Sequence, residues 1–244
     1  MSQTNTIKLI NINIEMNRHL DTVSAFLERE KPDVVCLQEL VQRDVPRFEK
    51  LLGMKGGFAP MATLDYPGFD AEVKGLPYGT GMFSRFSDVY TTDYYSGNAD
   101  SLPSGLTGGE GNKTLIRSTF AAHGKTYTVG ATHFTWTPDG EANDAQRQHM
   151  TAFLAVLKNL PDSVFCGDFN APRGGEMWTR MAAEFTDNIP SSYDSSLDPK
   201  LHRVGHLRRM VDGIFSTPEY KVTEVTLVEG ISDHKAVVGF VERI

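Results

Sequence analysis

The chain has 244 residues, a mass of 27.0 kDa and 40% apolar residues, which is enough to bury one large core. Its formal net charge is −7 and its isoelectric point is about 5.5, so a general nucleic-acid coat protein is disfavoured. Any phosphate group that the protein handles must meet local positive residues or a metal ion. We expect a single domain over residues 1–244.

The two cysteines, Cys36 and Cys166, lie in apolar runs, where a thiol packs as a small hydrophobic group, and they offer no ligand set for zinc. Residues 1–6 lack the apolar core of a signal sequence, and no stretch approaches the roughly 18 apolar residues of a membrane span. We therefore expect a cytoplasmic protein in a reducing compartment, with no membrane partner, and we expect a monomer.

The N-terminal part of the chain shows both strand and helix patterns. Short Val/Ile/Leu-rich runs bounded by turn residues predict buried strands, and apolar residues three and four positions apart predict helices. Met16, Leu20, Val23 and Leu27 have helical spacing, and Pro32 prevents that helix from continuing. The strands predicted up to residue 133 cover residues 7–12, 33–38, 81–86, 88–95, 113–120 and 125–133.

Three more helices are predicted further along the chain. One runs from about Pro46, which suits a first helical turn, to Gly53, which suits a C-terminal cap. A second covers about 142–159, with Ala145 and His149 on its apolar stripe, and we interpret His149 as a packed core histidine. The third has Met177, Met181 and Phe185 on one face, and the remaining strands are predicted at 163–167, 211–216, 220–229 and 235–241.

Three long segments are predicted to be irregular. Residues 56–80 and 96–112 are rich in glycine, and 186–209 is predicted to be another loop. Strands mixed with a few long helices indicate an α/β (α+β) architecture of layered sheets covered by helices.

Polar residues stand where several predicted strands end. Such residues can reach solvent while their backbone stays rigid, so strand ends that converge on one opening would make a site. The strings that follow or end the apolar runs are Asn13, Leu37-Gln38-Glu39, Thr132-His133, Gly167-Asp168-Phe169-Asn170, Val211-Asp212-Gly213-Ile214-Phe215 and Ser232-Asp233-His234.

In this order, the last five of these strings resemble the successive motifs of the endonuclease/exonuclease/phosphatase superfamily of metal-dependent phosphoesterases, over nearly the whole chain. One departure is Met210, since many members have arginine before the Asp-containing strand motif, whereas here Arg208 and Arg209 lie just upstream. The resemblance implies a four-layer α/β sandwich, in which two mixed, mostly antiparallel sheets pack face to face with helices outside.

The resemblance also implies a metal site, with Glu39 as the principal ligand and with Asn13 and Asp233 in support. Oxygen ligands suit Mg²⁺ or Mn²⁺ better than zinc. Hydrolysis of a phosphate ester needs a deprotonated water in line with the leaving oxygen, and positive charge or donors around the other phosphoryl oxygens. The inventory of acids, amides and imidazoles suits that chemistry.

The remaining motif residues take catalytic roles by the same resemblance. Asp168 would orient and activate the water, and Asn170 would hold the transition state. His133 and His234 would contact the scissile phosphate. Asp212 would accept a hydrogen bond from His234, which fixes the tautomer of that histidine and favours its charged form.

Each residue also has a structural interpretation of its own. Asn13 could simply end a strand, Glu39 could be an exposed acid, and Asp168 with Asn170 could form a turn. Asp212 could cap the start of the last hairpin. Five such strings in the order of one family favour catalytic roles for these residues. The remaining alternative is that the protein is a folded but inactive relative of the family.

The substrate is indicated by three weaker features. Trp136 follows His133 and could offer an aromatic face to a base or a sugar, or could anchor its own loop. Tyr193 belongs to the string Ser192-Tyr193-Asp194-Ser195, which resembles an element of the branch that includes tyrosyl-DNA phosphodiesterases and deadenylases. Residues 200–209 form a basic cluster, either a solvated loop or a phosphate-binding edge, whose candidate substrate residues are His202, Arg203, Arg208 and Arg209.

Three functions are therefore compatible with the sequence. The first is a divalent-metal-dependent phosphodiester hydrolase whose partner is a nucleic acid or nucleotide, acting on ends, single strands or protein-linked nucleotides. The alternative is a phosphatase or lipid-type phosphodiesterase with a small phosphorylated substrate. The third is an inactive phosphate-binding relative.

Overall fold

Twelve strands form two six-stranded sheets in the structure, a computed structural model that describes residues 5–65, 71–104 and 111–244. The first sheet has the order β11 (Tyr220–Val228), β12 (Ala236–Arg243), β1 (Ile7–Asn13), β2 (Val34–Val41), β4 (Pro77–Ser84) and β3 (Gly56–Thr63). The second has the order β5 (Thr91–Ser96), β6 (Lys113–Ala122), β7 (Lys125–His133), β8 (Val164–Asp168), β10 (Asp212–Ser216) and β9 (Thr186–Asp187).

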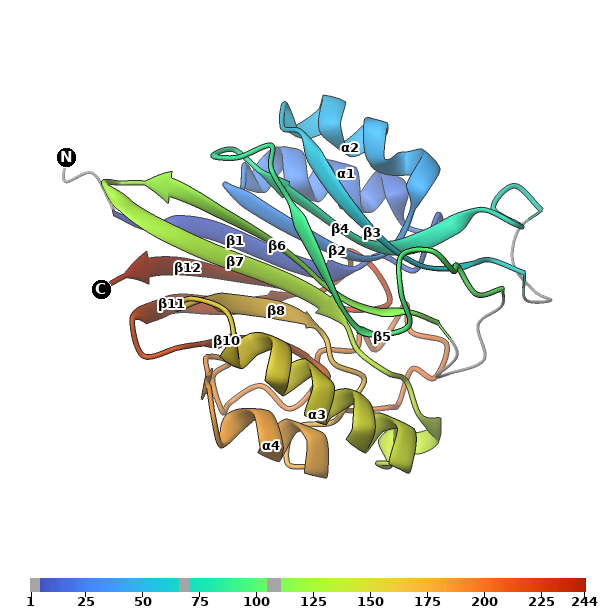
Figure 1. Ribbon diagram of the computed structural model, residues 1–244. Coiled ribbons are helices and arrows are strands. Elements are labelled where there is room, and N and C mark those ends of the chain that lie inside the picture. Colours follow the sequence, from blue (N-terminus) through green and yellow to red (C-terminus); the bar gives the residue numbers. More distant parts are fainter. Residues whose placement is uncertain (1–4, 66–70, 105–110) are drawn as a thin grey trace.

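The helices form the two outer layers. Figure 1 shows α1 (Leu20–Glu30) and α2 (Val45–Leu52) over the first sheet, and α3 (Asp144–Lys158) and α4 (Glu176–Ala182) over the second. Among the described strands, only β1–β2 and β7–β8 pair in parallel. The predicted four-layer sandwich of two mixed, mostly antiparallel sheets is therefore confirmed. No helix in the described ranges is long and apolar enough to cross a bilayer.

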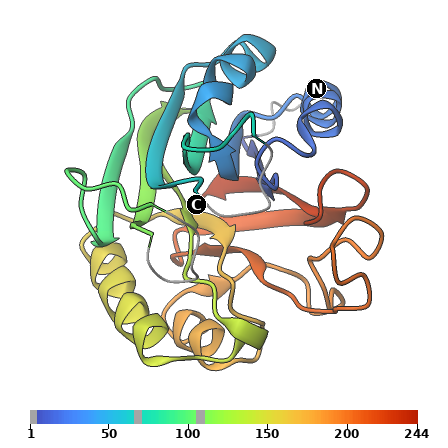
Figure 2. The same ribbon diagram turned by 90° about the vertical axis from the view of Figure 1, so that its right-hand side faces the viewer.

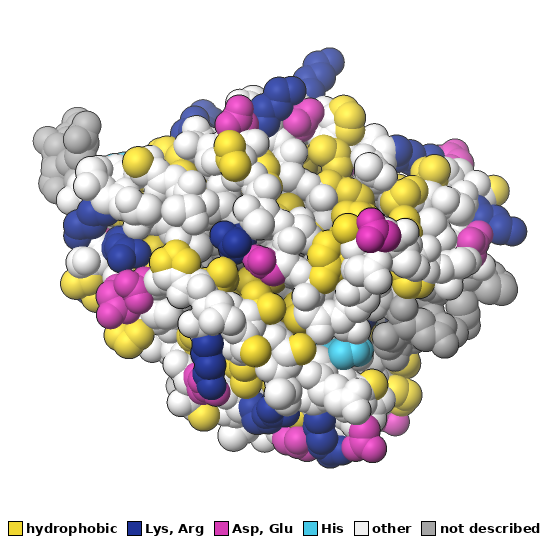
Figure 3. Space-filling view, viewed as in Figure 1, with side chains coloured by type: hydrophobic (Ala, Val, Ile, Leu, Met, Phe, Trp, Pro, Cys, Tyr) yellow, Lys and Arg dark blue, Asp and Glu magenta, His cyan; other side chains and the backbone are white. Residues whose placement is uncertain are grey.

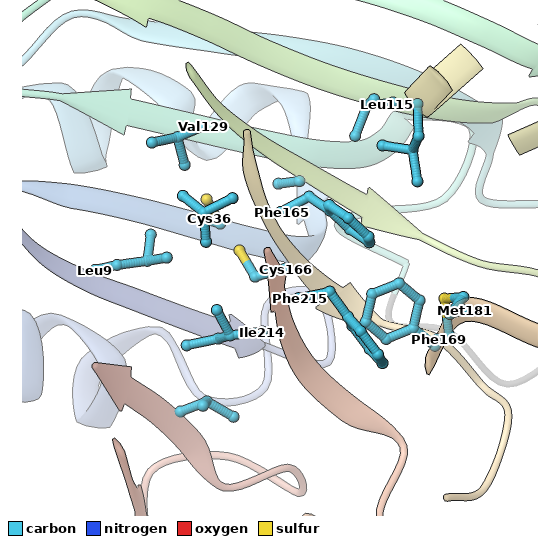
Figure 4. Close-up of a cluster of buried hydrophobic side chains, with 14 of the residues drawn as sticks. Leu9, Cys36, Leu115, Val129, Phe165, Cys166, Phe169, Met181, Ile214 and Phe215 are labelled. Atoms are coloured by element: carbon cyan, nitrogen blue, oxygen red, sulfur yellow. The ribbon is translucent and has the colours of Figure 1, made fainter. Parts of the chain in front are cut away.

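The main core lies between the facing sheets. Leu9 and Cys36 of the first sheet face Cys166 and Ile214 of the second (Figure 4), and all four are fully buried. Both cysteines are free thiols, as their apolar surroundings predict. Close packing of this interface holds the two sheets, and hence the loops at their ends, in one fixed arrangement.

The buried face of α3 differs from the prediction. Ala145 is exposed and His149 is half-buried, with its Nδ1 2.7 Å from Thr135 Oγ1. The larger side chains on the neighbouring stripe decide the orientation, because they bury more apolar area. That stripe consists of Met150, Phe153, Leu154 and Leu157.

The prediction of an irregular segment at 56–80 was wrong, since β3 and the start of β4 lie there. Gly56 is a strand residue that lets an aromatic side chain pack closely, and a Cβ at this position would stand 2.4 Å from Phe83 Cε1. Glycine therefore marks close packing here instead of a turn. The strand predicted at 88–95 begins later, as β5, and part of the loop predicted at 96–112 lies outside the described residues.

Candidate active site

Strand direction brings the motif residues to one edge of the sandwich. The parallel strands β1 and β2 end together, with Asn13 in register with Gln38. In the other sheet His133 pairs with Asp168, and Asp168 pairs with Asp212 at the start of β10. Figure 2 looks onto this edge. Polar residues from separate strings thus meet at this edge, as the strand-end pattern predicts.

Glu39 owes its direction to an irregularity in β2. The register with β4 shifts between Leu37 and Leu40, and Glu39 has φ of 56°, in the left-handed region that non-glycine residues rarely adopt. A β-bulge re-aims a side chain, and bulges are common beside active sites. Gln38 helps to hold the bulge, since its Nε2 donates to Asn11 Oδ1 at 2.8 Å.

Asn13 connects the acids of the two sheets. Its Nδ2 donates to Glu39 Oε1 and to Asp168 Oδ2, both at 3.1 Å, and its Oδ1 accepts from the Glu15 amide at 3.1 Å. Asn13 is therefore placed as an amide that orients two carboxylates. All of its polar side-chain atoms have protein partners.

Asp168 lies at the centre of the site and is 1% exposed. Its Oδ2 is 3.6 Å from His133 Nε2 and 3.8 Å from His234 Nε2, while its Oδ1 accepts from the Asn170 amide at 2.8 Å. The Asn170 side chain donates to the Phe134 carbonyl at 3.1 Å. This places Asn170 beside Asp168, held by the loop that follows β7.

His234 forms the predicted hydrogen bond with Asp212. Its Nδ1 lies 2.7 Å from Asp212 Oδ2, and Asp212 is fully buried. Burial opposes a charge on His234, but the carboxylates of Asp212, Asp168 and Asp233 outweigh it and raise its pKa well above the usual value. His234 is therefore a cation near neutral pH, with Nε2 directed toward Asp168.

Burial and crowding raise the pKa of the central acids. Burial, with smaller contributions from Asp233 and Asp168, raises the pKa of Glu39 to about 7. Burial and Asp212 likewise raise the pKa of Asp168 to about 7, against the charge of His234. Burial, with Lys113 and His234, lowers the pKa of His133 to about 3, so that imidazole is neutral.

This arrangement fits a divalent cation. Carboxylates gather here in two neighbouring groups: Asp168 and Asp212 have ligand atoms within 4.8 Å of each other, and Asp233 is close enough to Glu39 to raise its pKa. Asp212 Oδ1 is a buried oxygen with no hydrogen-bond partner among the described residues. Burial first, and neighbouring acids second, raise the pKa of Glu39 and Asp168, and a hard cation would favour the charged form of both carboxylates. The donor set is dominated by carboxylate oxygens and has no thiolate, which suits Mg²⁺ or Mn²⁺.

Glu15, His19 and Ser196 were missed by the sequence interpretation. Ligand atoms of Glu15, His19 and Asp233 lie within 4.8 Å of one another, on the rim next to Glu39. The signal that could have found Glu15 is its position two residues after Asn13. Ser196 Oγ accepts from the Val211 and Asp212 amides, both at 3.0 Å, and it holds the start of β10 without any sequence signal of its own.

The predicted substrate residues are spread unevenly around the opening. The ring of His202 lies 6.3 Å from that of His234, edge to face, so His202 borders the site. Trp136 is 44% exposed on the loop after His133. Arg209 reaches the turn after Trp136. Its Nη1 lies close to Gly140, 3.0 Å from the position that a Cβ would take there.

The other three predicted substrate residues do not contact the motif residues. Arg208 pairs with Asp194 at 2.9 Å on the surface, and Arg203 is exposed and forms no ion pair with a described residue. Tyr193 is half-buried, packs against the main core, and accepts from Arg173 through its carbonyl at 3.4 Å. Tyr193 is therefore placed for packing.

We expect Asp212→Asn to lower the pKa of His234, because Asp212 is the largest of the charges that oppose the effect of burial. The cationic form of His234 would then be lost at a lower pH, and the alkaline limb of the pH profile of kcat should shift downward. The loss of turnover should be milder than for replacement of His234 itself. An unchanged alkaline limb would show that Asp212 does not set the charge of His234.

The fold recurs in solved structures. The human Nocturnin catalytic domain with bound sulfate is 19% identical, with a TM-score of 0.72 and coverage of 98% of this chain and 94% of that chain. D. rerio TDP2 humanized by 14 mutations is 17% identical, with a TM-score of 0.66 and coverage of 98% and 100%. The mannosyl-6-phosphatase Bt3783 of Bacteroides thetaiotaomicron VPI-5482 is 12% identical, with a TM-score of 0.67 and coverage of 96% and 99%.

A comparison with curated protein sequences gave no match. The model of the Endonuclease/Exonuclease/phosphatase family matches residues 10–234, which include every motif residue from Asn13 to His234. Members of this family are generally phosphoesterases or nucleases that depend on a divalent metal, and the buried acids and histidines described above agree with that dependence. The chain belongs to the endonuclease/exonuclease/phosphatase family.

Proposed function

We propose that this protein is a Mg²⁺- or Mn²⁺-dependent phosphodiesterase that hydrolyses nucleic acid, at ends, in single strands or where a nucleotide is linked to protein. The observation that carries the chemistry is the buried Asp168 carboxylate, which lies within 4 Å of His133 and His234 and is joined through Asn13 to Glu39. A base, a cation and a metal ligand are thus held around one space.

The proposed reaction assigns one task to each of these groups. Asp168, a buried carboxylate between His133 and His234, is suited to orient water and to accept a proton from it. The cationic His234 donates from Nε2 to a phosphoryl oxygen as negative charge develops there. The neutral His133 offers Nε2 on the other side of Asp168.

Positioning residues keep these groups in place. Asn13 orients the two carboxylates, and Asp212 orients His234. A divalent cation, which Glu39 and Asp233 would hold, supplies positive charge that stabilises the pentavalent phosphorus. Attack by water on phosphorus then breaks the bond to the leaving oxygen.

The proposed nucleic-acid substrate is supported by the basic rim. His202 borders His234, and Arg209 reaches Gly140 in the loop that follows β7. The Nocturnin structure holds a sulfate, an anion with the tetrahedral shape of phosphate. On the face shown in Figure 3, lysines and arginines are interspersed with acids and form no single basic surface. That face therefore offers no extended basic surface to a strand.

A substrate panel tests this proposal. The protein would be incubated with Mg²⁺ or Mn²⁺ and labelled oligonucleotides, bis-nitrophenyl phosphate, mannose 6-phosphate, inositol phosphates and sphingomyelin. We expect the highest kcat/KM for an oligonucleotide. A higher kcat/KM for a sugar phosphate or a lipid would contradict the proposed function and favour a phosphatase or a lipid-type phosphodiesterase. No hydrolysis of any substrate would indicate an inactive relative.

The basic segment 200–209 allows a sharper test. Arg203→Ala, and the double change Arg208→Ala with Arg209→Ala, should raise KM for an oligonucleotide relative to bis-nitrophenyl phosphate, which is too short to reach these residues. Removal of an arginine that neutralises a phosphate should also weaken the salt dependence of binding. For a single strand, the slope of the logarithm of the binding constant against the logarithm of the salt concentration should become shallower by about 0.7 for each such arginine. Arg85→Ala is a matched control, since Arg85 follows the far end of β4.

Two results would contradict that expectation. Equal losses on both substrates would place these arginines in the catalytic centre. No change on either substrate would leave segment 200–209 as a solvated loop.

A further inference from the structure

A cavity of about 280 Å³ lies between the loop after β1, the first turn of α1, and the segment that leads from β2 into α2. Its size suits a phosphate with part of its sugar better than a drug-sized molecule. Three arginines and a histidine stand against two acids in its lining. These charged residues are Arg18, His19, Asp21, Arg43, Arg47 and Glu72, and we call the cavity the arginine pocket.

The arginines of the pocket are held in place and keep free donors. Arg47 Nη2 is 2.7 Å from Asp21 Oδ1, and its guanidinium also contacts Ser24 Oγ. Arg43 Nη2 is 3.6 Å from Glu72 Oε2, its Nε is 3.8 Å from Asp44 Oδ2, and its Nη1 donates to the Glu72 carbonyl. Arg18 pairs through Nη1 with Glu15. A guanidinium carries five N–H donors, so each pairing leaves several for a phosphate.

Acids offset the charge of the pocket: besides Asp21 and Glu72 in its lining, Glu15 pairs with Arg18 and His19, and Asp44 lies 3.8 Å from Arg43. Affinity for a phosphate therefore depends on the N–H donors that these pairings leave free, and not on a net positive charge. The side chains of Asp21 and Glu72 are 97% and 78% exposed, so water screens them strongly. The first turn of α1 adds to the positive character, because its N-cap residue His19 makes no side-chain capping bond and residues 20–22 line the cavity.

The arginine pocket adjoins the candidate active site. His19 Nε2 is 3.1 Å from Glu15 Oε2, and ligand atoms of both residues lie within 4.8 Å of that of Asp233. Asp233 is close enough to Glu39 to raise its pKa and precedes His234 in the chain. In Figure 2, α1 and the loop that carries His202 lie on opposite sides of the C-terminal segment that holds His234.

We propose that the arginine pocket binds a non-scissile phosphate of the substrate strand, on the side of the scissile bond opposite to His202. This inference rests on the proposed nucleic-acid function. It makes a second prediction about the substrate: the strand must extend past the cleaved bond in both directions to reach its full affinity. Small phosphomonoesters could not use the pocket and the catalytic centre together.

The test is binding of a fluorescent 12-nucleotide single strand to full-length protein in an Asp168→Ala background, followed by anisotropy over a range of salt concentrations. Arg43→Ala should raise Kd on the order of tenfold, and Arg43→Ala with Arg47→Ala should raise it further. The salt slope should fall by about 0.7 for each phosphate that a variant no longer neutralises. A dinucleotide should bind these variants and their parent alike, because it cannot span the two sites.

Arg29→Ala is the matched control, because Arg29 lies in the last turn of α1, away from the pocket. Arg47 also ties α1 to α2, so Arg43→Ala, which leaves that tie intact, keeps the test decisive if the double variant unfolds. If the parent binds the strand, and Arg43→Ala binds it with the same Kd as Arg29→Ala, the inference about the arginine pocket is overturned. The proposed nucleic-acid function would then still stand. If the parent itself binds no strand, the proposed nucleic-acid function falls with it.

Discussion

Replacement of Glu39, Asp168 or His234 by alanine should lower kcat by a factor on the order of 10² or more, because each group acts on the transition state. The fold should survive. Glu39 and Asp168 have a pKa raised to about 7 by burial and by neighbouring acids, so their removal relieves repulsion and leaves the apolar core untouched. The measurement is steady-state hydrolysis, with circular dichroism and thermal unfolding as checks on the fold.

Asp162→Ala is the matched control for these variants, since Asp162 precedes β8 at the end of the sandwich far from the site. Its kcat should equal that of the unmodified protein. A folded variant at Glu39, Asp168 or His234 with near-normal kcat would remove the role assigned to that residue. Loss of folding in all three variants would contradict the view that these residues contribute little to packing.

Removal of divalent metal should abolish turnover. His234 Nε2 lies 3.8 Å from Asp168 Oδ2, and one imidazolium does not offset the charge of the acids and of a phosphodiester. The measurement is hydrolysis during titration with EDTA, followed by addition of Mg²⁺, Mn²⁺ or Ca²⁺. Mg²⁺ or Mn²⁺ should restore turnover.

Ca²⁺ should bind without full restoration, because its looser coordination holds water less strictly. Binding can be followed as a rise in the melting temperature, which any cation that binds only the folded state produces. Full turnover in excess EDTA would exclude the metal from the mechanism.

The strand-end motifs could be predicted from the sequence because each depends on local pattern. Short apolar runs ending in Asn13, His133 and Asp168 become buried strands, and parallel pairing then brings their ends to one edge. The order of these strings along the chain was sufficient for the family and the four-layer fold. These features need no knowledge of packing.

Other features depend on contacts between distant residues and could not be predicted. Gly56 indicates a turn until Phe83 is placed against it, and the alanine stripe of α3 indicates a buried face until Phe153 is seen to fill the core. The bulge that directs Glu39 arises from a register shift against β4, which no local pattern encodes. The arginine pocket likewise combines the β1–α1 loop with α2 and with Glu72, which lie far apart in the sequence.

The central claim, attack on phosphorus by a water that Asp168 activates, is tested most directly by hydrolysis of a DNA oligonucleotide in water enriched in heavy oxygen, with Mg²⁺ present. Mass spectrometry would locate the label after a single turnover. We expect one heavy oxygen on the phosphate-bearing product and none on the alcohol product, and we expect Asp168→Ala to form this labelled product more slowly by a factor on the order of 10². A heavy oxygen on the alcohol product, or formation of labelled product by Asp168→Ala at the rate of the unmodified protein, would contradict the account.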